Sequence, residues 1–347
     1  MEGFADPKAC AIRVPYLNSD VMNRSLLLVF AGLFAAASAM AQPLAGVPDV
    51  SKLRLSSANA LILDAEAGQP VYAKGADTVT PIASLTKLMT AMVTLDANLP
   101  MDEPIDVSIQ DFDFLKGSSS RLRLGATLSR HEMLRLALMA SENRAASSLA
   151  RHYPGGRAAF VEQMNKKAVE LGMTHTHFED PTGLTPENVS TANDLAKMVS
   201  AAAQYSVIRE FTTTSSAAVE VQPTGQVIGF NNTNMLVKNP KWDIQVSKTG
   251  YIKEAGKCLV MLATISSRPF VIVLLDSLGK YTRVGDAQRV KQWLETGDSA
   301  GAEEPKAPSL LRAKAPKSSV KAKHLKGQLS PTLAQQATRK GKTRHAV

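Results

Sequence analysis

The sequence predicts an α+β fold in which strands from both ends of one domain form an antiparallel sheet, with a helical subdomain inserted between them. Short apolar runs with strand-like composition lie near the start, at 60–64, and near the end, at 258–265 and 270–276. Residues 84–203 instead carry apolar side chains at helical spacing. Because short connections join the closing strands, we expect antiparallel pairing and helices that cover the sheet.

Each element has a local signal. The runs 60–64 and 70–74 flank a turn that contains Gly68, which predicts a hairpin. A long helical pattern opens at Ser84, and the chain becomes β-rich after Gly225, with a further strand at 244–249. The remaining helices are predicted at 129–139, 144–152, 156–171, 192–203 and 284–294.

The two ends of the chain differ from the domain between them. An apolar run follows Arg24 and ends in Ala-Met-Ala at 39–41, which predicts a signal peptide over 1–41 that is cleaved after Ala41. We interpret Met22 as the true start, and an uncleaved membrane anchor is the alternative. One folded domain is expected at 42–300, followed by a basic tail at 301–347 that is predicted to be disordered.

The basic charge is confined to that tail. The formal net charge is +9, and residues 301–347 carry eleven Lys or Arg and two Glu, so the rest of the chain balances to zero. A basic patch on a domain would suggest nucleic acid, but a basic tail on an exported protein does not, and we expect no nucleic-acid partner. Anionic lipid headgroups or envelope polymers are the expected partners, and a solvated tail without a partner is the alternative.

Neither cysteines nor histidines predict a cofactor site. Cys10 precedes the cleavage site, so the mature chain keeps only Cys258, which lies in an apolar strand and is interpreted as a small buried hydrophobe. His175 and His177 lie on one short segment without a third ligand nearby in the sequence, which is too few for a metal site. We expect no metal and no cofactor.

Three short motifs follow one another along the chain: Ser-Leu-Thr-Lys at 84–87, Ser-Glu-Asn at 141–143 and Lys-Thr-Gly at 248–250. Each is weak alone, because Ser-x-x-Lys recurs at 277–280 and 318–321. Only Ser84 opens a helical pattern, and only this copy precedes the other two motifs. The ordered set is therefore the signal.

The first motif predicts an activated nucleophile. Ser84 and Lys87 are three residues apart, so on a helix they share one face and the lysine amine reaches the serine hydroxyl. An ordinary lysine is protonated at pH 7, but burial and a second cation, for which Lys248 is the candidate, lower its pKa. A serine beside such a base is suited to covalent catalysis.

The other motifs complete the predicted site. Ser141 is expected to relay a proton between the lysines and the leaving group, and Asn143 to hold a substrate amide. Thr249 offers a hydroxyl, and Gly250 a bare backbone along which a peptide can lie as an added strand. The backbone N–H groups of Ser84 and Tyr251 are the expected oxyanion hole. Glu142 is interpreted as a solvated loop acid, with tuning of proton transfer as the alternative.

These motifs resemble those of the low-molecular-mass penicillin-binding proteins, the D-alanyl-D-alanine carboxypeptidase and endopeptidase family. The segments 180–184 and 232–236 resemble that family's connecting motifs, and the similarity runs from about Leu53 to Leu294. The resemblance implies a β-lactamase/transpeptidase-like fold and a periplasmic serine D,D-peptidase. It also implies that Ser84 is acylated by peptidoglycan peptides and by β-lactams.

The short chain after Leu294 suggests the endopeptidase-like branch, although carboxypeptidase activity stays open. Two alternatives also remain. A serine β-lactamase needs a glutamate for deacylation, and the sequence does not choose among Glu162, Glu170, Glu179 and Glu187. A non-catalytic muropeptide-binding protein would keep the fold without forming an acyl-enzyme.

Overall fold

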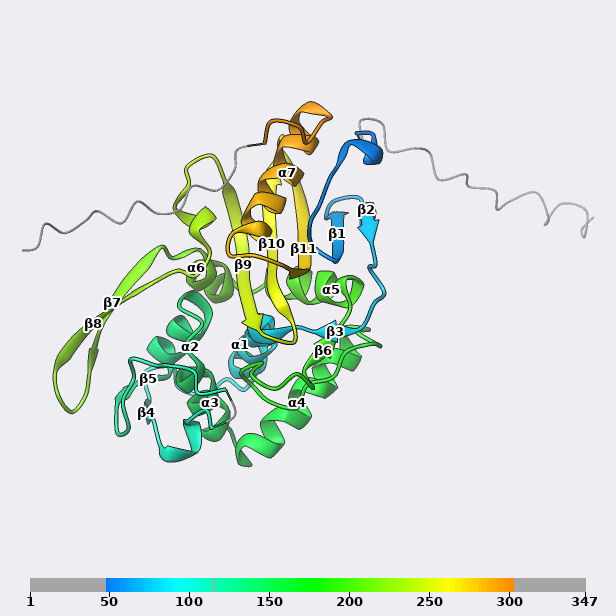
Figure 1. Cartoon of the computed structure of the whole chain (residues 1–347). Coiled ribbons are helices and arrows are strands. Elements are labelled where there is room, and N and C mark those ends of the chain that lie inside the picture. Colours follow the sequence, from blue (N-terminus) through cyan, green and yellow to red (C-terminus); the bar gives the residue numbers. More distant parts are fainter. Residues whose placement is uncertain (1–47, 115, 303–347) are drawn as a thin grey trace, which may run out of the picture. The chain divides into compact units, whose positions relative to one another are not determined.

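A five-stranded antiparallel sheet organises the domain. The computed structural model describes residues 48–114 and 116–302, and its main sheet has the strand order β2-β1-β11-β10-β9. The hairpin β1 (Asn59–Asp64) and β2 (Gln69–Lys74) lies beside β11 (Arg268–Ser277), and β10 (Gly256–Ile265) and the edge strand β9 (Asp243–Ile252) follow. The predicted union of both ends of the domain in one sheet is confirmed (Figure 1).

The two faces of this sheet pack against different helices. Along β11, Ile272 and Leu274 contribute to the cluster under α7 (Thr282–Thr296), whereas Val271 and Val273 point into the larger core on the other face. This alternation follows the two-residue period of a strand. The helix α5 (Ala192–Ala202) covers the second face against β1, β10 and β11. Burial of both faces explains the nearly continuous apolar runs in the sequence.

The inserted block is mainly helical. It contains α1 (Lys87–Asp96), α2 (Arg130–Met139), α3 (Asn143–Arg151) and α4 (Gly156–Glu170), which match the predicted helices to within three residues. Sequence reasoning missed α6 (Ser206–Thr213) and the projecting hairpin of β7 (Ser216–Val221) and β8 (Gln226–Asn231) (Figure 1). The other short elements are β3 (Thr80–Pro81), β4 (Pro104–Asp106), β5 (Thr127–Ser129), β6 (Val189–Ser190), η1 (Val50–Lys52), η2 (Ala83–Thr86), η3 (Ile109–Asp111) and η4 (Met235–Lys238).

The start of the first long helix differs from the expectation. Ser84 lies in the 3₁₀ turn η2, and α-helical geometry begins only at Lys87. Ala83, with φ of 49°, directly precedes Ser84 in a left-handed conformation that prevents a regular helix from starting earlier. The serine and lysine still lie on one side of the backbone, because η2 runs directly into α1 (Lys87–Asp96).

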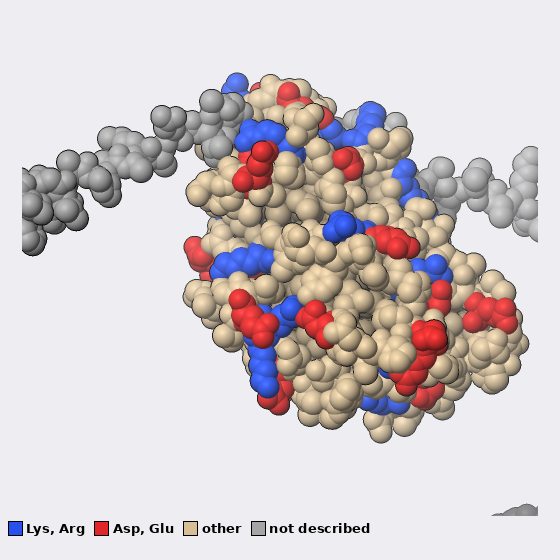
Figure 2. Space-filling view, turned by 180° about the vertical axis from the view of Figure 1, so that it is seen from behind, with Lys and Arg blue, Asp and Glu red and all other residues tan. Residues whose placement is uncertain are grey.

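Two sequence predictions lie outside the described residues: the signal peptide at 1–41 and nearly all of the basic tail. Within 48–302, excepting residue 115, no helix is long and apolar enough to cross a membrane. On the face shown in Figure 2, basic and acidic side chains are interspersed. That distribution agrees with the balanced charge calculated for the chain without its tail.

Candidate active site

The structure brings Ser84 and Lys87 into direct contact. The Lys87 ammonium nitrogen lies 2.9 Å from Ser84 Oγ, 2.7 Å from Asn143 Oδ1 and 2.6 Å from the carbonyl oxygen of Thr182. The lysine is completely buried, and burial lowers its pKa to about 7, a shift that the charges of Asp180 and Glu142 oppose. A lysine with this pKa is partly neutral at physiological pH and can accept a proton.

A second buried lysine approaches from the edge strand β9. Lys248 Nζ donates to Ser141 Oγ at 2.8 Å and to the carbonyl oxygen of Thr249 at 3.0 Å. Burial, then the charges of Lys87 and Arg283, holds the pKa of Lys248 well below its usual value. The charge of Lys87 thus lowers the pKa of Lys248, whereas the sequence predicted that Lys248 would lower the pKa of Lys87, for which burial is the cause. Ser141 lies against Lys248.

Close backbone packing fixes the nucleophile beside β9. A methyl group on Gly250 would lie 2.9 Å from the Ile82 carbonyl oxygen and 3.2 Å from the Ser84 nitrogen, so only glycine fits without displacement. Ser141 also has a left-handed backbone, with φ of 58°. Strained backbone of this kind persists where the surrounding structure over-determines it, and it is common at functional sites.

A cleft of about 510 Å³ opens over these groups. It is lined by Ser84, Ser141, Asn143, Thr249, Gly250 and Tyr251 from the predicted set, and by Lys116, Ser118, Leu184, Thr233, Ile252, Lys253 and Arg283. The Thr249 hydroxyl lies 2.6 Å from that of Thr233, and Arg283 Nη1 donates to the carbonyl oxygen of Gly250 at 2.7 Å. The hydroxyls and the guanidinium suit a substrate carboxylate.

Comparison with known proteins agrees with this geometry. The sequence profile of the D-alanyl-D-alanine carboxypeptidase family matches residues 44–279. The chain belongs to this family. It is 48% identical over 275 residues to the D-alanyl-D-alanine endopeptidase of Pseudomonas aeruginosa, covering 79% of this chain and 88% of that relative. It is 46% identical over 273 residues to the D-alanyl-D-alanine endopeptidase of Escherichia coli, covering 79% and 87%.

Solved structures give the same answer for the fold. A crystal structure of a Streptomyces DD-transpeptidase matches with a TM-score of 0.65 at 29% identity, covering 70% of this chain and 98% of that one. Penicillin-binding protein D2 of Listeria monocytogenes, in its cefotaxime-bound form, matches with a TM-score of 0.62 at 29% identity and the same coverage. This D-alanyl-D-alanine peptidase is a serine hydrolase with the β-lactamase/transpeptidase-like fold, and it is a low-molecular-mass penicillin-binding protein.

Seven residues that line the cleft in this peptidase were not predicted as site residues, and three of them, Ser118, Thr233 and Arg283, contact predicted ones. Ser118 accepts a hydrogen bond from Asn143 Nδ2 at 3.0 Å, but its loop carries no motif. Thr233 belongs to the segment 232–236, which was noted only as a connecting motif. Arg283 comes from α7 beyond the last motif, and the sequence gives no signal for it because only the pairing of β9 with β10 brings this helix near the cleft.

The interpretation of Glu142 as a residue in contact with solvent is wrong. It was interpreted as a solvated loop acid, yet its side chain is only 8% exposed and its Oε1 has no hydrogen-bond partner among the described residues. The loop at 118–122 covers it, as contacts of its neighbours Asn143 and Arg144 with that loop show. Burial of this kind depends on tertiary contacts and cannot be read from the Ser-Glu-Asn pattern.

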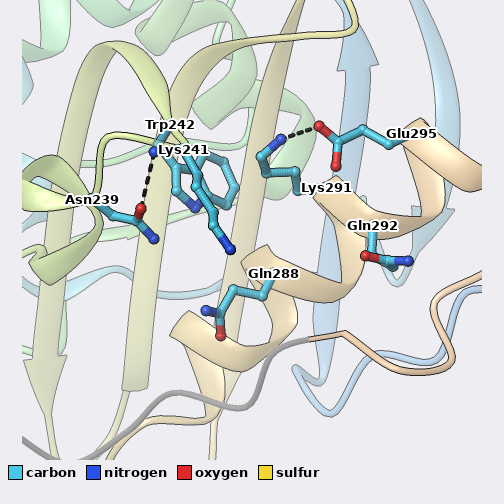
Figure 3. Close-up of a pocket in the computed structure, with 7 residues that line it drawn as sticks. All are labelled: Asn239, Lys241, Trp242, Gln288, Lys291, Gln292 and Glu295. Carbon is cyan, nitrogen blue, oxygen red and sulfur yellow. Dashed lines mark hydrogen bonds and ion pairs between the residues drawn. The ribbon is translucent and has the colours of Figure 1, made fainter.

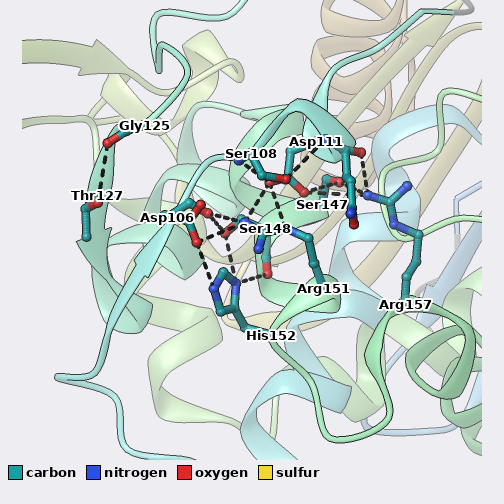
Figure 4. Close-up of polar contacts among 11 residues, drawn as sticks. Asp106, Ser108, Asp111, Gly125, Thr127, Ser147, Ser148, Arg151, His152 and Arg157 are labelled. Carbon is teal, nitrogen blue, oxygen red and sulfur yellow. Dashed lines mark hydrogen bonds and ion pairs between the residues drawn. The ribbon is translucent and has the colours of Figure 1, made fainter.

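A buried ion cluster lies on α3, the helix that begins at Asn143 (Figure 4). Asp111 is 4% exposed and accepts from Ser147 at 2.8 Å and from Arg151 at 3.0 and 3.1 Å, and Arg157 lies within 3.5 Å. These contacts tie η3 (Ile109–Asp111) to α3. A second hollow of about 660 Å³ borders this cluster and shares Asn143 and Leu184 with the cleft around Ser84.

Other features of the described residues lie outside this machinery. Cys258 is fully buried, and burial raises its pKa to about 11, so it is confirmed as a buried side chain. No group of three or more His, Cys, Asp or Glu in the described parts of the chain could hold a metal ion. A groove between α7 and the start of β9, which contains Trp242 and Gln288 (Figure 3), shares no lining residue with the cleft.

Proposed function

We propose that this peptidase cleaves D-Ala-containing crosslinks of peptidoglycan through an acyl-enzyme on Ser84. The observation that carries the proposal is the contact of Ser84 Oγ with the buried Lys87 ammonium group, whose pKa is lowered by burial to about 7. The endopeptidase direction rests on the two bacterial relatives, named D-alanyl-D-alanine endopeptidases, to which this chain is 46–48% identical.

In the proposed acylation step, neutral Lys87 takes the proton of Ser84 as Oγ bonds to the substrate carbonyl carbon. The backbone N–H groups of Ser84 and Tyr251 stabilise the resulting oxyanion. When the intermediate collapses, the peptide C–N bond breaks and Lys87 returns the proton to the leaving amine, with Ser141 as relay. Water then hydrolyses the ester, releases the carboxylic acid and regenerates the Ser84 hydroxyl.

Substrate binding is assigned to the remaining cleft residues. Asn143 holds the amide on the acyl side, and the carboxylate of the leaving group lies against Lys248, Thr249 and Arg283. The bare backbone of Gly250 admits the peptide alongside the β9 edge. In an endopeptidase the leaving group is a diamino acid whose carboxylate adjoins the scissile amide, so the same cationic groups serve both crosslinks and terminal D-Ala.

The test is a comparison of two serine-to-alanine variants. Ser84→Ala is expected to abolish both benzylpenicillin labelling and cleavage of purified crosslinked muropeptides. Ser318→Ala, which alters a Ser-x-x-Lys copy that follows the other two motifs in the sequence, should leave both intact. Retained cleavage by Ser84→Ala would exclude the acyl-enzyme. Faster release of terminal D-Ala from monomeric pentapeptide than cleavage of crosslinks would reassign the protein as a carboxypeptidase.

The lifetime of the penicillin adduct separates the alternatives. A stable adduct supports a peptidase, whereas rapid drug turnover supports a β-lactamase. Of the four glutamates considered for deacylation, Glu162 is solvent-exposed and paired with Lys166 at 2.9 Å. Glu179 lines the neighbouring hollow. Intact-mass measurements over hours distinguish these outcomes, and a protein that binds muropeptides without any adduct would be a non-catalytic binding protein.

Location and envelope contacts are also part of the proposal. We place the mature domain, residues 42–300, in the periplasm after cleavage of the signal peptide at 1–41, with the basic tail at 301–347 free to contact anionic lipids or wall polymers. Mass spectrometry of the secreted protein should give Gln42 as its first residue. A chain ending at Ala300 should lose association with envelope fractions, and unchanged fractionation would remove the tail from this account.

A further inference from the structure

The most unusual group near the cleft is the buried acid in the middle of the Ser-Glu-Asn motif. Glu142 lies between Ser141, which contacts Lys248, and Asn143, which contacts Lys87. Its Oε1 is buried without a hydrogen-bond partner among the described residues. An unpaired buried carboxyl oxygen is costly, so its presence calls for a functional reason.

The surrounding contacts hold this carboxyl in place. The first two residues of α3 both contact the loop at 118–122. Asn143 Nδ2 donates to Ser118 Oγ at 3.0 Å, and Arg144 Nη1 donates to the Leu122 carbonyl oxygen at 2.6 Å. The Ser120 hydroxyl of the same loop lowers the pKa of Glu142. The loop therefore shields the carboxyl from water, next to the residue that contacts Lys87.

Burial and the nearby charges have opposite effects on the pKa values of Glu142 and Lys87. Burial raises the pKa of Glu142, whereas the hydrogen bonds from Ser120 and the Arg144 backbone, and the charges of Lys87 and Arg144, lower it. Burial lowers the pKa of Lys87, and the charges of Asp180 and Glu142 raise it again. The charges of Lys87 and Arg283 in turn lower the pKa of Lys248. Glu142 thus offsets part of the burial that would make Lys87 too weak a base.

We propose that Glu142 is a positioning residue whose charge sets the proton affinity of Lys87, and with it the pH range in which Ser84 is acylated. A general base works best when its proton affinity matches the operating pH. This inference rests on the proposed function, because it assumes that Lys87 is the base. It assigns the middle residue of the motif a role that Ser141 and Asn143 do not have.

The decisive variant is Glu142→Gln, which keeps the shape and the hydrogen-bond acceptor but removes the charge. With a negative neighbour gone, the pKa of Lys87 should fall. The ratio of benzylpenicillin acylation rates at pH 6 and pH 8 should therefore rise roughly two- to fivefold, the effect of lowering a pKa of about 7 by about half to one unit. Glu295→Gln, on the far part of α7, is the matched control and should leave the ratio unchanged.

The other outcomes are equally informative. The inference is overturned if the ratio is unchanged, because a merely structural Glu142 would alter the acylation rates at all pH values alike. It is also overturned if the pH below which acylation slows moves upward. If Glu142→Gln does not fold, Ser120→Ala provides the test. Without the Ser120 hydroxyl the neutral form of Glu142 is favoured, so the ratio of acylation rates at pH 6 and pH 8 should again rise. Wild-type protein that is never acylated would instead refute the proposed function.

Discussion

The pH dependence of Ser84 acylation is the sharpest prediction from this site, because it follows from one buried amine. If Lys87 is the general base, only its neutral form reacts. With a pKa of about 7, it is about half neutral at pH 7, about one-tenth neutral at pH 6 and about one-hundredth neutral at pH 5. The acylation rate should therefore fall about fivefold from pH 7 to pH 6 and about tenfold per unit below pH 6.

The assay is rapid-mixing measurement of labelling by a fluorescent penicillin between pH 5 and pH 9, on wild-type protein shown to be folded throughout by circular dichroism. The penicillin carboxylate stays ionised over this range, so it does not contribute to the limb. A profile that is flat down to pH 5 would mean that Lys87 is not the base. A midpoint near the ordinary lysine value would mean that burial does not tune it.

Three substitutions probe the supports of the site. Gly183→Ala should unfold or severely destabilise the domain, because the added methyl would lie 1.9 Å from the Ala83 carbonyl oxygen at a φ of 79°; a thermal melt close to that of the wild type would contradict this packing. Asp111→Ala should lower stability by roughly 3 kcal/mol in urea unfolding, since it leaves Arg151 without its buried partner; a loss below about 1 kcal/mol would show that this ion cluster is not needed. Arg283→Ala should reduce the preference for benzylpenicillin over its methyl ester by roughly tenfold or more in acylation assays; an unchanged preference would place the substrate carboxylate elsewhere.

The sequence could predict those parts of the site in which the chemistry itself demands certain residue types. The three motifs are recognisable by their order: a serine hydroxyl, a lysine one turn later, and a strand that carries a lysine and a glycine. Ser84 and Lys87 are in contact, and the charge of Lys87 acts on Lys248. Residues that assist through tertiary position leave no such mark. Arg283 is an ordinary arginine in an amphipathic helix, and only the register of β9 and β10 gives it the Gly250 carbonyl oxygen as a partner.

The same contrast holds for the fold. Buried strands such as β10 and β11 carry strong apolar runs, so the central sheet was predictable. The hairpin of β7 and β8 was not, because only Val219, Val221 and Phe230 are buried and its exposed positions, apart from Val227, are polar or small. Its weak pattern reflects packing on one side only. The prediction that Glu142 is solvated failed for a related reason, because a loop about 20 residues earlier in the chain covers its side chain.

The burial of the two lysines at this site lowers the free energy of unfolding of the domain. Each must lose its water on folding, and the burial that lowers both pKa values disfavours the charged forms. For Lys87, whose pKa falls from 10.5 to about 7, the unfolded chain binds more protons than the folded one between these values. Stability from this group therefore decreases as the pH falls from the upper value to the lower one. The burial of Lys87 thus costs most below about pH 7, where it is an inert cation, and the cost decreases as the pH rises into the range in which Lys87 acts as a base. A selection for stability alone would replace this lysine, whereas acylation of Ser84 requires it.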